Sequence, residues 1–259
     1  MKSSILCLPL LIASLTPDSL AAGVSTGKNP VVLETSDSGW WFRVAPYVWL
    51  TATEGDAGIA GFEAPVDIGF DDTLDTLDLG FMAVFEAGKG KWSLGLDGIY
   101  ATFSQDVTTG GRLFKSGEFE QTQLILTPRV SYNLIQTPDY RMDILAGARW
   151  TMIDYDLTLR LADGQISRGT DEDWMDPVIG VRGRWYFTEK ASLTYSGDIG
   201  GFGVGSDLTW QAFLGLGYRF TPGITGVIGY RGLGIDYKDD GFTLDTVAHG
   251  PLVGLEVIF

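Results

Sequence analysis

The stretch 242–259 reads FTLDTVAHGPLVGLEVIF and decides the fold. Counting back from its end by twos gives the apolar residues Phe259, Val257, Leu255, Val253 and Pro251. Because alternate side chains of a strand point to opposite faces, the segment has one apolar face and one polar or small face that includes Glu256. Such a strand with an aromatic carboxy-terminus is typical of the closing strand of a bacterial outer-membrane barrel, with Phe259 in the periplasmic aromatic girdle. The last strand of a soluble sandwich is the alternative.

The beginning of the chain has the composition of a secretory signal peptide. Lys2 precedes a mainly apolar run over 5–15, and small residues allow cleavage after Ala21. This run is too short to span a membrane as a helix. We therefore predict a signal peptide over 1–21, a periplasmic lead-in over 22–38 and a barrel over 39–259. The single cysteine, Cys7, lies in the signal, which leaves no disulfide or thiolate metal site in the mature chain.

Composition narrows the function classes further. Asp and Glu number 33 against 18 Lys and Arg, a net charge of -15, and a surface that binds nucleic acid must be basic. Nucleic acid is therefore excluded as a partner. The 35 glycines and the 12% aromatic content suit a barrel with tight turns and interfacial girdles.

Alternation of apolar and polar residues recurs in ten segments. They are 39–53, 77–87, 91–104, 118–134, 140–157, 174–187, 191–203, 207–220, 223–237 and 243–259. Connections between them alternate between tight turns and mostly longer loops, as in membrane barrels with short periplasmic turns. An even count also leaves both termini in the periplasm. We therefore predict an all-β, antiparallel transmembrane barrel of about ten strands, in which the first and last strands pair.

Aromatic residues cluster near both ends of the predicted strands. Those expected in the periplasmic girdle are Trp40, Trp41, Trp92, Tyr132, Tyr186, Phe187, Tyr218, Phe220 and Phe259. Those expected in the outer girdle are Tyr100, Trp150, Trp174 and Trp210. Rings of this kind mark the two membrane interfaces of a barrel.

Prolines interrupt four predicted strands, at Pro46, Pro128, Pro177 and Pro251. Each lacks one ladder hydrogen bond, so we expect bulges or strand ends at these positions. A helical turn could also begin in the first outer loop, over 71–79.

The face opposite lipid carries nearly matched charge, and every cation on it is an arginine. The residues predicted to form an ion-pair network in the lumen are Arg43, Asp97, Arg129, Arg149, Asp176, Arg182, Asp198 and Arg231. Arginine suits confined pairing because its planar fork bonds carboxylates bidentately. We expect Asp198 to bond Arg182 or Arg231. The network is either a structural plug or a charge-lined path for a small solute; ten strands lie close to the size at which side chains fill a barrel.

Two features lie at the outer rim. The loop over 54–76 holds seven carboxylates without a Lys or Arg, which suits divalent cations or simply forms a solvated acidic rim. The only histidine, His249, could act with Asp207 or Asp245 as a catalytic base, although the register from Phe259 places it on the lipid face. A rim histidine without a catalytic role is the alternative. No zinc, serine-hydrolase or phosphate-loop motif is present, so we predict no metal, cofactor or catalytic residue.

Several stretches resemble a widespread family of uncharacterised proteobacterial outer-membrane β-barrel proteins. They are PYVWL at 46–50, the ranges 66–100, 143–157, 173–177 and 197–211, GYR at 229–231, DY at 236–237 and HGP at 249–251. The sequence departs from the family at 148–151, where the family has an Arg-Tyr-Trp order. The resemblance implies a barrel and an outer-membrane address, and it brings no activity or substrate.

Three functions remain open from the sequence. The leading one is a non-enzymatic barrel, either a structural protein or a narrow channel for small solutes. The others are an enzyme that modifies envelope lipids at the outer rim, and a surface-binding protein acting through the acidic loops. Expected partners are outer-membrane lipids, divalent cations at the acidic loops, and the barrel-assembly machinery, which would recognise the strand ending at Phe259.

Overall fold

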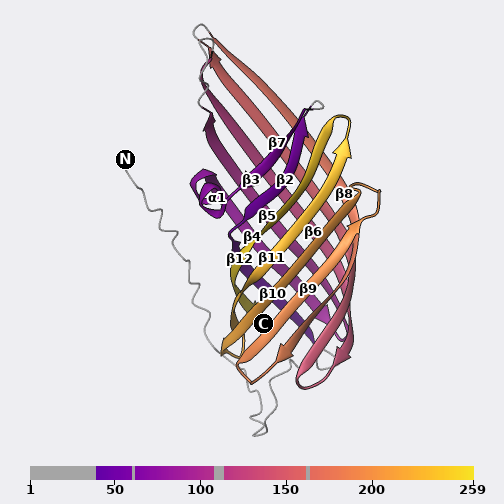
Figure 1. The fold of residues 1–259 in the computed structure, drawn as a ribbon. Coiled ribbons are helices and arrows are strands. Elements are labelled where there is room, and N and C mark those ends of the chain that lie inside the picture. The colour runs from indigo at the N-terminus through magenta and orange to yellow at the C-terminus, as the bar shows by residue number, and fades with distance from the viewer. Residues whose placement is uncertain (1–38, 60–61, 108–113, 162–163) are drawn as a thin grey trace.

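The computed structural model describes residues 39–59, 62–107, 114–161 and 164–259, and within them the chain forms one antiparallel sheet closed into a barrel (Figure 1). The strands are β1 (Trp40–Trp49), β2 (Ala52–Ile59), β3 (Phe62–Ile68), β4 (Leu77–Lys89), β5 (Trp92–Val107), β6 (Phe114–Gln136), β7 (Tyr140–Leu161), β8 (Gly164–Tyr186), β9 (Ala191–Gly201), β10 (Leu208–Thr221), β11 (Ile224–Asp239) and β12 (Phe242–Ile258). The predicted signal peptide (1–21) and lead-in (22–38) lie outside the described residues.

The barrel closes between its first and last strands. β1 pairs with β4 on one side and with β12 on the other, and β4 to β12 follow one another in chain order. Beyond Trp49, β2 continues the path of β1 beside the upper half of β12. Ten strands therefore encircle the interior, which confirms the predicted fold and strand count. In the described ranges, no helix is long and apolar enough to cross a membrane.

The outer connections differ from the prediction because they are largely strand. The segment 54–76 holds most of the β2–β3 hairpin and the helix α1 (Phe70–Thr76), which accounts for the expected helical turn. β6, β7 and β8 have 23, 22 and 23 residues, whereas a strand that crosses a bilayer needs about 9–11. These strands rise well above the others in Figure 1. Sequence alternation did not reveal the extensions because neither face there needs to be apolar.

All four prolines lie where strand pairing stops or is interrupted. The β1–β4 ladder ends at Pro46, the β8–β9 ladder begins just after Pro177, and the β6–β7 ladder skips Pro128. Pro251 faces the break between β1 and β2. The four strands nevertheless continue through these prolines, and the register shifts of the described ladders fall elsewhere. The expectation of bulges or strand ends is therefore wrong, and each proline instead interrupts the ladder on one side of its strand.

The outward faces are apolar, as predicted from the alternation. Exposed outward residues near the short-turn end are Trp40, Phe42, Trp92, Trp185, Phe187, Tyr218, Phe220 and Phe259. Three predicted girdle members point inward instead: Trp41 and Tyr186 line an internal cavity, and Trp174 is buried against Tyr237 with ring centroids 3.9 Å apart. Trp41 and Tyr186 were misassigned because each has an aromatic neighbour in the sequence, so that either face could hold a ring.

β6 and β7 approach each other closely where their ladder skips Pro128, and this close contact leads to a prediction about stability. A Cβ added at Gly147 would lie 2.2 Å from the Pro128 carbonyl oxygen, whereas one added at Gly98 meets no atom closer than 3.5 Å. Gly147→Ala should therefore destabilise the barrel by about 1–3 kcal/mol. Gly98→Ala is the matched control and should change stability by less than about 0.5 kcal/mol.

The measurement is the temperature at which each purified variant loses its compact band on a heat-modifiability gel. Equal transition temperatures for the two variants would contradict the close packing at this gap.

Candidate functional site

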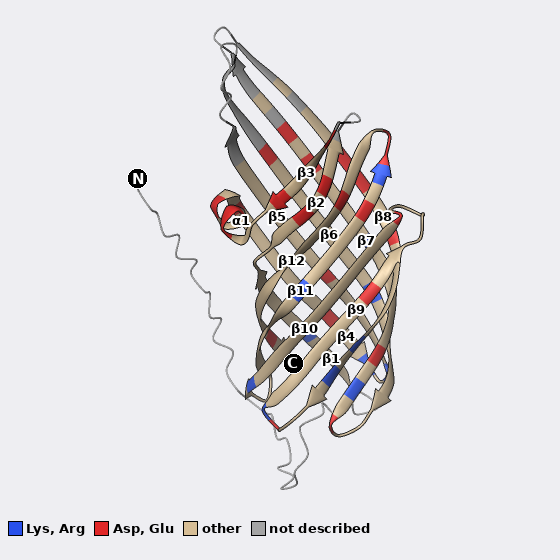
Figure 2. Ribbon diagram, in the orientation of Figure 1, with Lys and Arg blue, Asp and Glu red and all other residues tan. Residues whose placement is uncertain are grey.

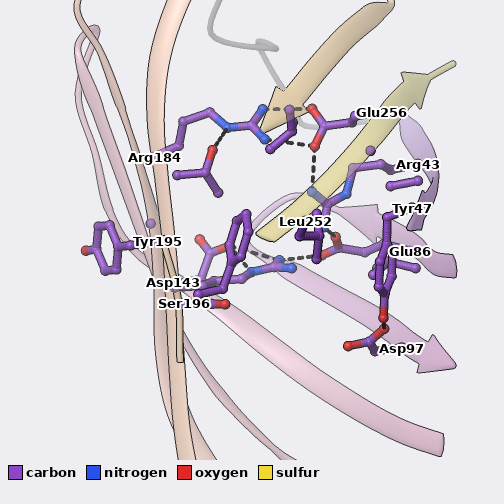
Figure 3. Close-up of a pocket in the computed structure, with 18 of the residues that line it drawn as sticks. Arg43, Tyr47, Glu86, Asp97, Asp143, Arg184, Tyr195, Ser196, Leu252 and Glu256 are labelled. Atoms are coloured by element: carbon purple, nitrogen blue, oxygen red, sulfur yellow. Dashed lines mark hydrogen bonds and ion pairs between the residues drawn. The ribbon is translucent and has the colours of Figure 1, made fainter. Parts of the chain in front are cut away.

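The interior nearest the short turns holds a network of ion pairs (Figure 3). Arg43 on β1 bonds Glu86 on β4 and lies 2.8 Å from Glu256 on β12. Arg184 on β8 donates two hydrogen bonds of 2.8 Å to the same Glu256 carboxylate. Because Glu256 and Glu86 are almost fully buried, their charges depend on these arginines for compensation.

Arg182 extends this layer to the far wall. It bonds Glu86 and lies 3.0 Å from Asp143 on β7. Asp143 also accepts hydrogen bonds from Asn133 at 2.7 Å and from Arg141 at 3.0 Å. Arg182 therefore belongs to the layer near the short turns.

A second layer lies further into the barrel and is centred on Arg231. Its guanidinium lies 3.0 Å from Asp97, 2.6 Å from the Tyr47 hydroxyl and 2.5 Å from the Gln211 side-chain oxygen. Tyr47 in turn donates to Asp97 at 2.7 Å. The Arg231 guanidinium also lies 5.0 Å from the ring centroid of Trp49, in a cation–π contact.

Asp198 has a different partner from the two that we expected. It accepts a 2.6 Å hydrogen bond from Arg149 on β7, two strands away, while Arg149 also donates to Thr209 at 2.7 Å. Arg149 has no exposed surface. The expectation of Arg182 or Arg231 is wrong because barrel strands tilt, so side chains at one height are offset along the ladder from strand to strand.

Asp176 stands apart from the ion pairs among the described residues. Its carboxylate is fully buried and accepts hydrogen bonds from the Ser206 backbone N–H at 2.7 Å, the Ser206 hydroxyl at 2.8 Å and the Trp174 indole at 3.1 Å. It therefore anchors the connection between β9 and β10 to β8, rather than joining the lumen network to which the sequence assigned it.

Arg129 is the cation of the network that has no anion of its own. No carboxylate in the described ranges comes within ion-pair distance of it, and its buried Nε has no hydrogen-bond partner. Its side chain lies across Gly95 on the adjacent strand, where a Cβ would come within 3.1 Å of Nε. Arg129 is therefore held in place by packing and by longer-range charge interactions with Asp97 and Glu86.

Apolar side chains gather in the interior beyond the second ionic layer, on the side formed by β11, β12, β1, β5 and β6. On β1, β5 and β11, the residues Trp49, Ile99 and Leu233 lie two positions beyond Tyr47, Asp97 and Arg231, respectively, and so on the same face. The apolar layer they form also contains Ile125 and Leu252. A second apolar cluster lies still further toward the extended end, and its members are Ile153, Trp174, Ile235, Tyr237, Phe242 and Leu244. The described interior is thus ionic near the short turns, while further up apolar side chains pack beside the buried Arg149 and Asp176.

A cavity of about 220 Å³ remains on the ionic side of the apolar layer. Its walls run from Trp41, Tyr186 and Ile258 near the short-turn end to Phe213 and Leu252 at mid-barrel. Leu252 belongs to both the cavity wall and the apolar layer. The cavity therefore extends from the short-turn end and stops inside the barrel.

The predicted outer-rim residues do not form one site. His249 lies on the outward face, where its Nδ1 is 2.7 Å from the Tyr230 hydroxyl and its ring makes an edge contact with Phe70 of α1. Its Nε2 lies 3.9 Å from the carboxylate of the exposed Glu54. Asp245 is four residues along β12 and pairs across the ladder with Asp236 and Asp56, while Asp207 lies beside β11. The structure does not bring Asp207 or Asp245 to His249.

Acidic residues gather toward the extended end, whereas most Lys and Arg lie nearer the short turns (Figure 2). Partial burial and the nearby Asp239 and Asp171 raise the pKa of Glu172. Burial, with Asp239 close by, also raises the pKa of Tyr237 to about 12. In the described part of the chain no group of three or more His, Cys, Asp or Glu side chains is arranged to hold a metal ion.

Sequence reasoning missed the neutral members of the interior. Gln211, Thr209, Asn133 and Ser206 satisfy arginines or carboxylates, yet a search for opposite charges passes over them. Strand alternation could have identified two of them. Thr209 and Gln211 alternate with the outward residues of β10, so their side chains must point inward.

The architecture is that of outer-membrane β-barrel proteins. The outer membrane protease OmpT from Escherichia coli superimposes with a TM-score of 0.57 at 10% sequence identity, covering 87% of this chain and 100% of that chain. The translocator domain of the autotransporter NalP from Neisseria meningitidis matches with a TM-score of 0.44 at 13% identity, over 88% of this chain and 91% of that chain. No protein-family model and no curated protein matches the sequence. At such low identities, the similarity to OmpT establishes the fold alone.

The Arg149–Asp198 pair generates a second prediction. Asp198→Ala leaves the fully buried Arg149 without its anion, which should cost about 3–5 kcal/mol of stability. Replacing both residues, as in Arg149→Met with Asp198→Ala, should recover part of that loss because no charge is then left uncompensated. The measurement is the unfolding free energy of the refolded protein in denaturant. The exposed Asp78 provides the control, and Asp78→Ala should stay within about 0.5 kcal/mol of the wild type.

If Asp198→Ala proves as stable as Asp78→Ala, the buried pair does not hold the interior together. A double variant that is less stable than Asp198→Ala would contradict the uncompensated charge as the cause.

Proposed function

We propose that this chain is an integral outer-membrane barrel without catalytic activity, whose interior is closed to the passage of solutes. The observation that carries the proposal is that the interior is filled at one height, by the apolar layer of Trp49, Ile99, Ile125, Leu233 and Leu252 on one side and by the buried Arg149–Asp198 pair on the other. A conducting path would have to be lined by water-accessible groups, whereas each of these five side chains is at most 7% exposed. The filled interior favours a structural barrel over the narrow channel.

The outer face supports the membrane location. Bulky apolar side chains such as Leu214, Leu216 and Ile228 are more than half exposed and would be covered by lipid. The terminal Phe259 is 70% exposed and packs near Phe42. Outer-membrane lipids are accordingly the first proposed partner, and the barrel-assembly machinery, acting on the strand that ends at Phe259, is the second.

The geometry around His249 does not favour a catalytic site at the outer rim. Its hydroxyl partner Tyr230 lies on the same outward face and is half exposed, so neither side chain is enclosed. Glu54, at 3.9 Å and largely exposed, does not orient the imidazole as a catalytic carboxylate does. OmpT is a protease, but a shared fold does not transfer an activity.

Surface binding is a second candidate, favoured by the length and charge of the outer extension. The β2–β3 hairpin exposes Glu54, Asp56, Glu63 and Asp67, and β6 to β8 continue far beyond the length that a bilayer requires. A cationic partner or divalent cations would be its ligands. Binding to immobilised polylysine tests it: a variant with these four carboxylates amidated should bind more weakly, and unchanged binding rejects this candidate.

Conductance in planar bilayers tests the closed interior. Wild-type protein should carry no steady current, and Trp49→Ala combined with Leu252→Ala should introduce one by opening the apolar layer. Trp40→Ala is the control, because Trp40 is 60% exposed on the outer face, and it should be as silent as the wild type. Steady wild-type current equal to that of the double variant would show that the apolar layer does not close the barrel.

A further inference from the structure

We infer that the cavity near the short-turn end is a binding site for a small oxyanion, a carboxylate or a phosphate, which enters from the periplasmic side. Binding is supported by the charge balance of the walls, by the unpaired arginine and by unpartnered hydrogen-bond donors. Only the single route of entry rests on the closed interior proposed above.

Cations outnumber anions around the cavity. The walls contain the six arginines Arg43, Arg129, Arg141, Arg182, Arg184 and Arg231, and the five carboxylates Glu86, Asp97, Asp143, Asp198 and Glu256. One of these carboxylates, Asp198, is already paired with Arg149, which is not part of the wall. The wall arginines therefore share four remaining carboxylates, and the cavity has an excess of positive charge.

This excess is concentrated at Arg129. Every other wall arginine makes an ion pair at 3.0 Å or closer, which fixes its orientation. Arg129 makes none with the described carboxylates: Arg182 and Arg43 repel it, and Asp97 and Glu86 attract it only from beyond ion-pair distance. A partly buried cation among like charges is costly, so an anion that binds beside Arg129 would gain the interaction that the protein itself leaves unmade.

The wall also has surplus hydrogen-bond donors. Besides Arg129 Nε, the buried Arg43 Nε and Arg182 Nη1 have no partner. Each guanidinium offers five N–H donors in a planar fork that matches the oxygens of a carboxylate or phosphate. A neutral solute would leave the charge excess in place, and a cation would add to it.

The size and openness of the cavity limit the ligand. Its volume of about 220 Å³ is many times the roughly 10–15 Å³ that one water needs, so a small anion fits. The wall reaches Trp41 and Ile258 at the short-turn end, while Phe213 and Leu252 bound the other end. Arg43, Arg182 and Arg184 keep 14–19% of their side-chain surface exposed, against none for Arg149 beyond the wall. The ligand therefore enters and leaves by the same end.

Isothermal titration calorimetry of the purified full-length barrel in detergent tests the site with two probes, inorganic phosphate and succinate. We expect saturable binding of at least one probe, and comparison of the two tells phosphate recognition from carboxylate recognition. In Arg129→Met the dissociation constant should rise at least tenfold. Lys91→Met removes one positive charge from an exposed position outside the cavity and should leave the constant unchanged within twofold.

Labelling of the wild type keeps the test decisive if Arg129→Met fails to fold. An arginine-selective dicarbonyl reagent should modify Arg129, and the probe that binds should protect it, as read by mass spectrometry. Absence of saturable binding by both probes overturns the inference. Binding that is equally strong in Arg129→Met, or bound probe that leaves Arg129 labelling unchanged, also overturns it.

Discussion

Arginines buried inside a closed barrel impose the constraint on which the rest of this interior depends. An arginine in proteins does not lose its charge, so each buried one needs an anion or a dense set of acceptors nearby. The fully buried Arg149 obtains Asp198, Thr209 and Gln211 from three positions on two other strands. Arg231 obtains Asp97, Tyr47 and Gln211 in the same way. Except for Arg231 with Gln211, these contacts join strands that are not neighbours in the sheet, and so fix the cross-section of the barrel.

The order of layers along the barrel axis explains why the interior is closed yet hollow at one end. Ion pairs alone leave gaps, because a guanidinium and a carboxylate pack less completely than apolar chains, and the cavity lies among them. Trp49 lies at the boundary, with one ring face toward Arg231 and its body in the apolar layer. The same residue thus stabilises the second ionic layer and separates it from the apolar cluster around Trp174 and Tyr237.

Much of this fold could be predicted from the sequence, because alternation reports directly which face meets an apolar environment. The closing strand, the inward arginines and the outward residues of β10 all follow from parity. Two other features of the structure do not follow from alternation. The partner of Asp198 depends on strand tilt, which no single strand encodes, and the extensions of β6 to β8 lie where no apolar face is required. The inward positions of Trp41 and Tyr186 were not predicted because each has an aromatic neighbour in the sequence, which could equally have pointed inward.

The central claim is that water reaches the ionic cavity from one end and stops at the apolar layer. Single cysteines introduced into a Cys7→Ser chain test it most directly, through their rates of reaction with a small charged methanethiosulfonate reagent. Ser196 lines the cavity and Leu233, 4% exposed, belongs to the apolar layer. The account predicts that the cysteine of Ser196→Cys reacts while that of Leu233→Cys stays unmodified in the folded barrel. Equal reaction rates at the two positions would contradict it.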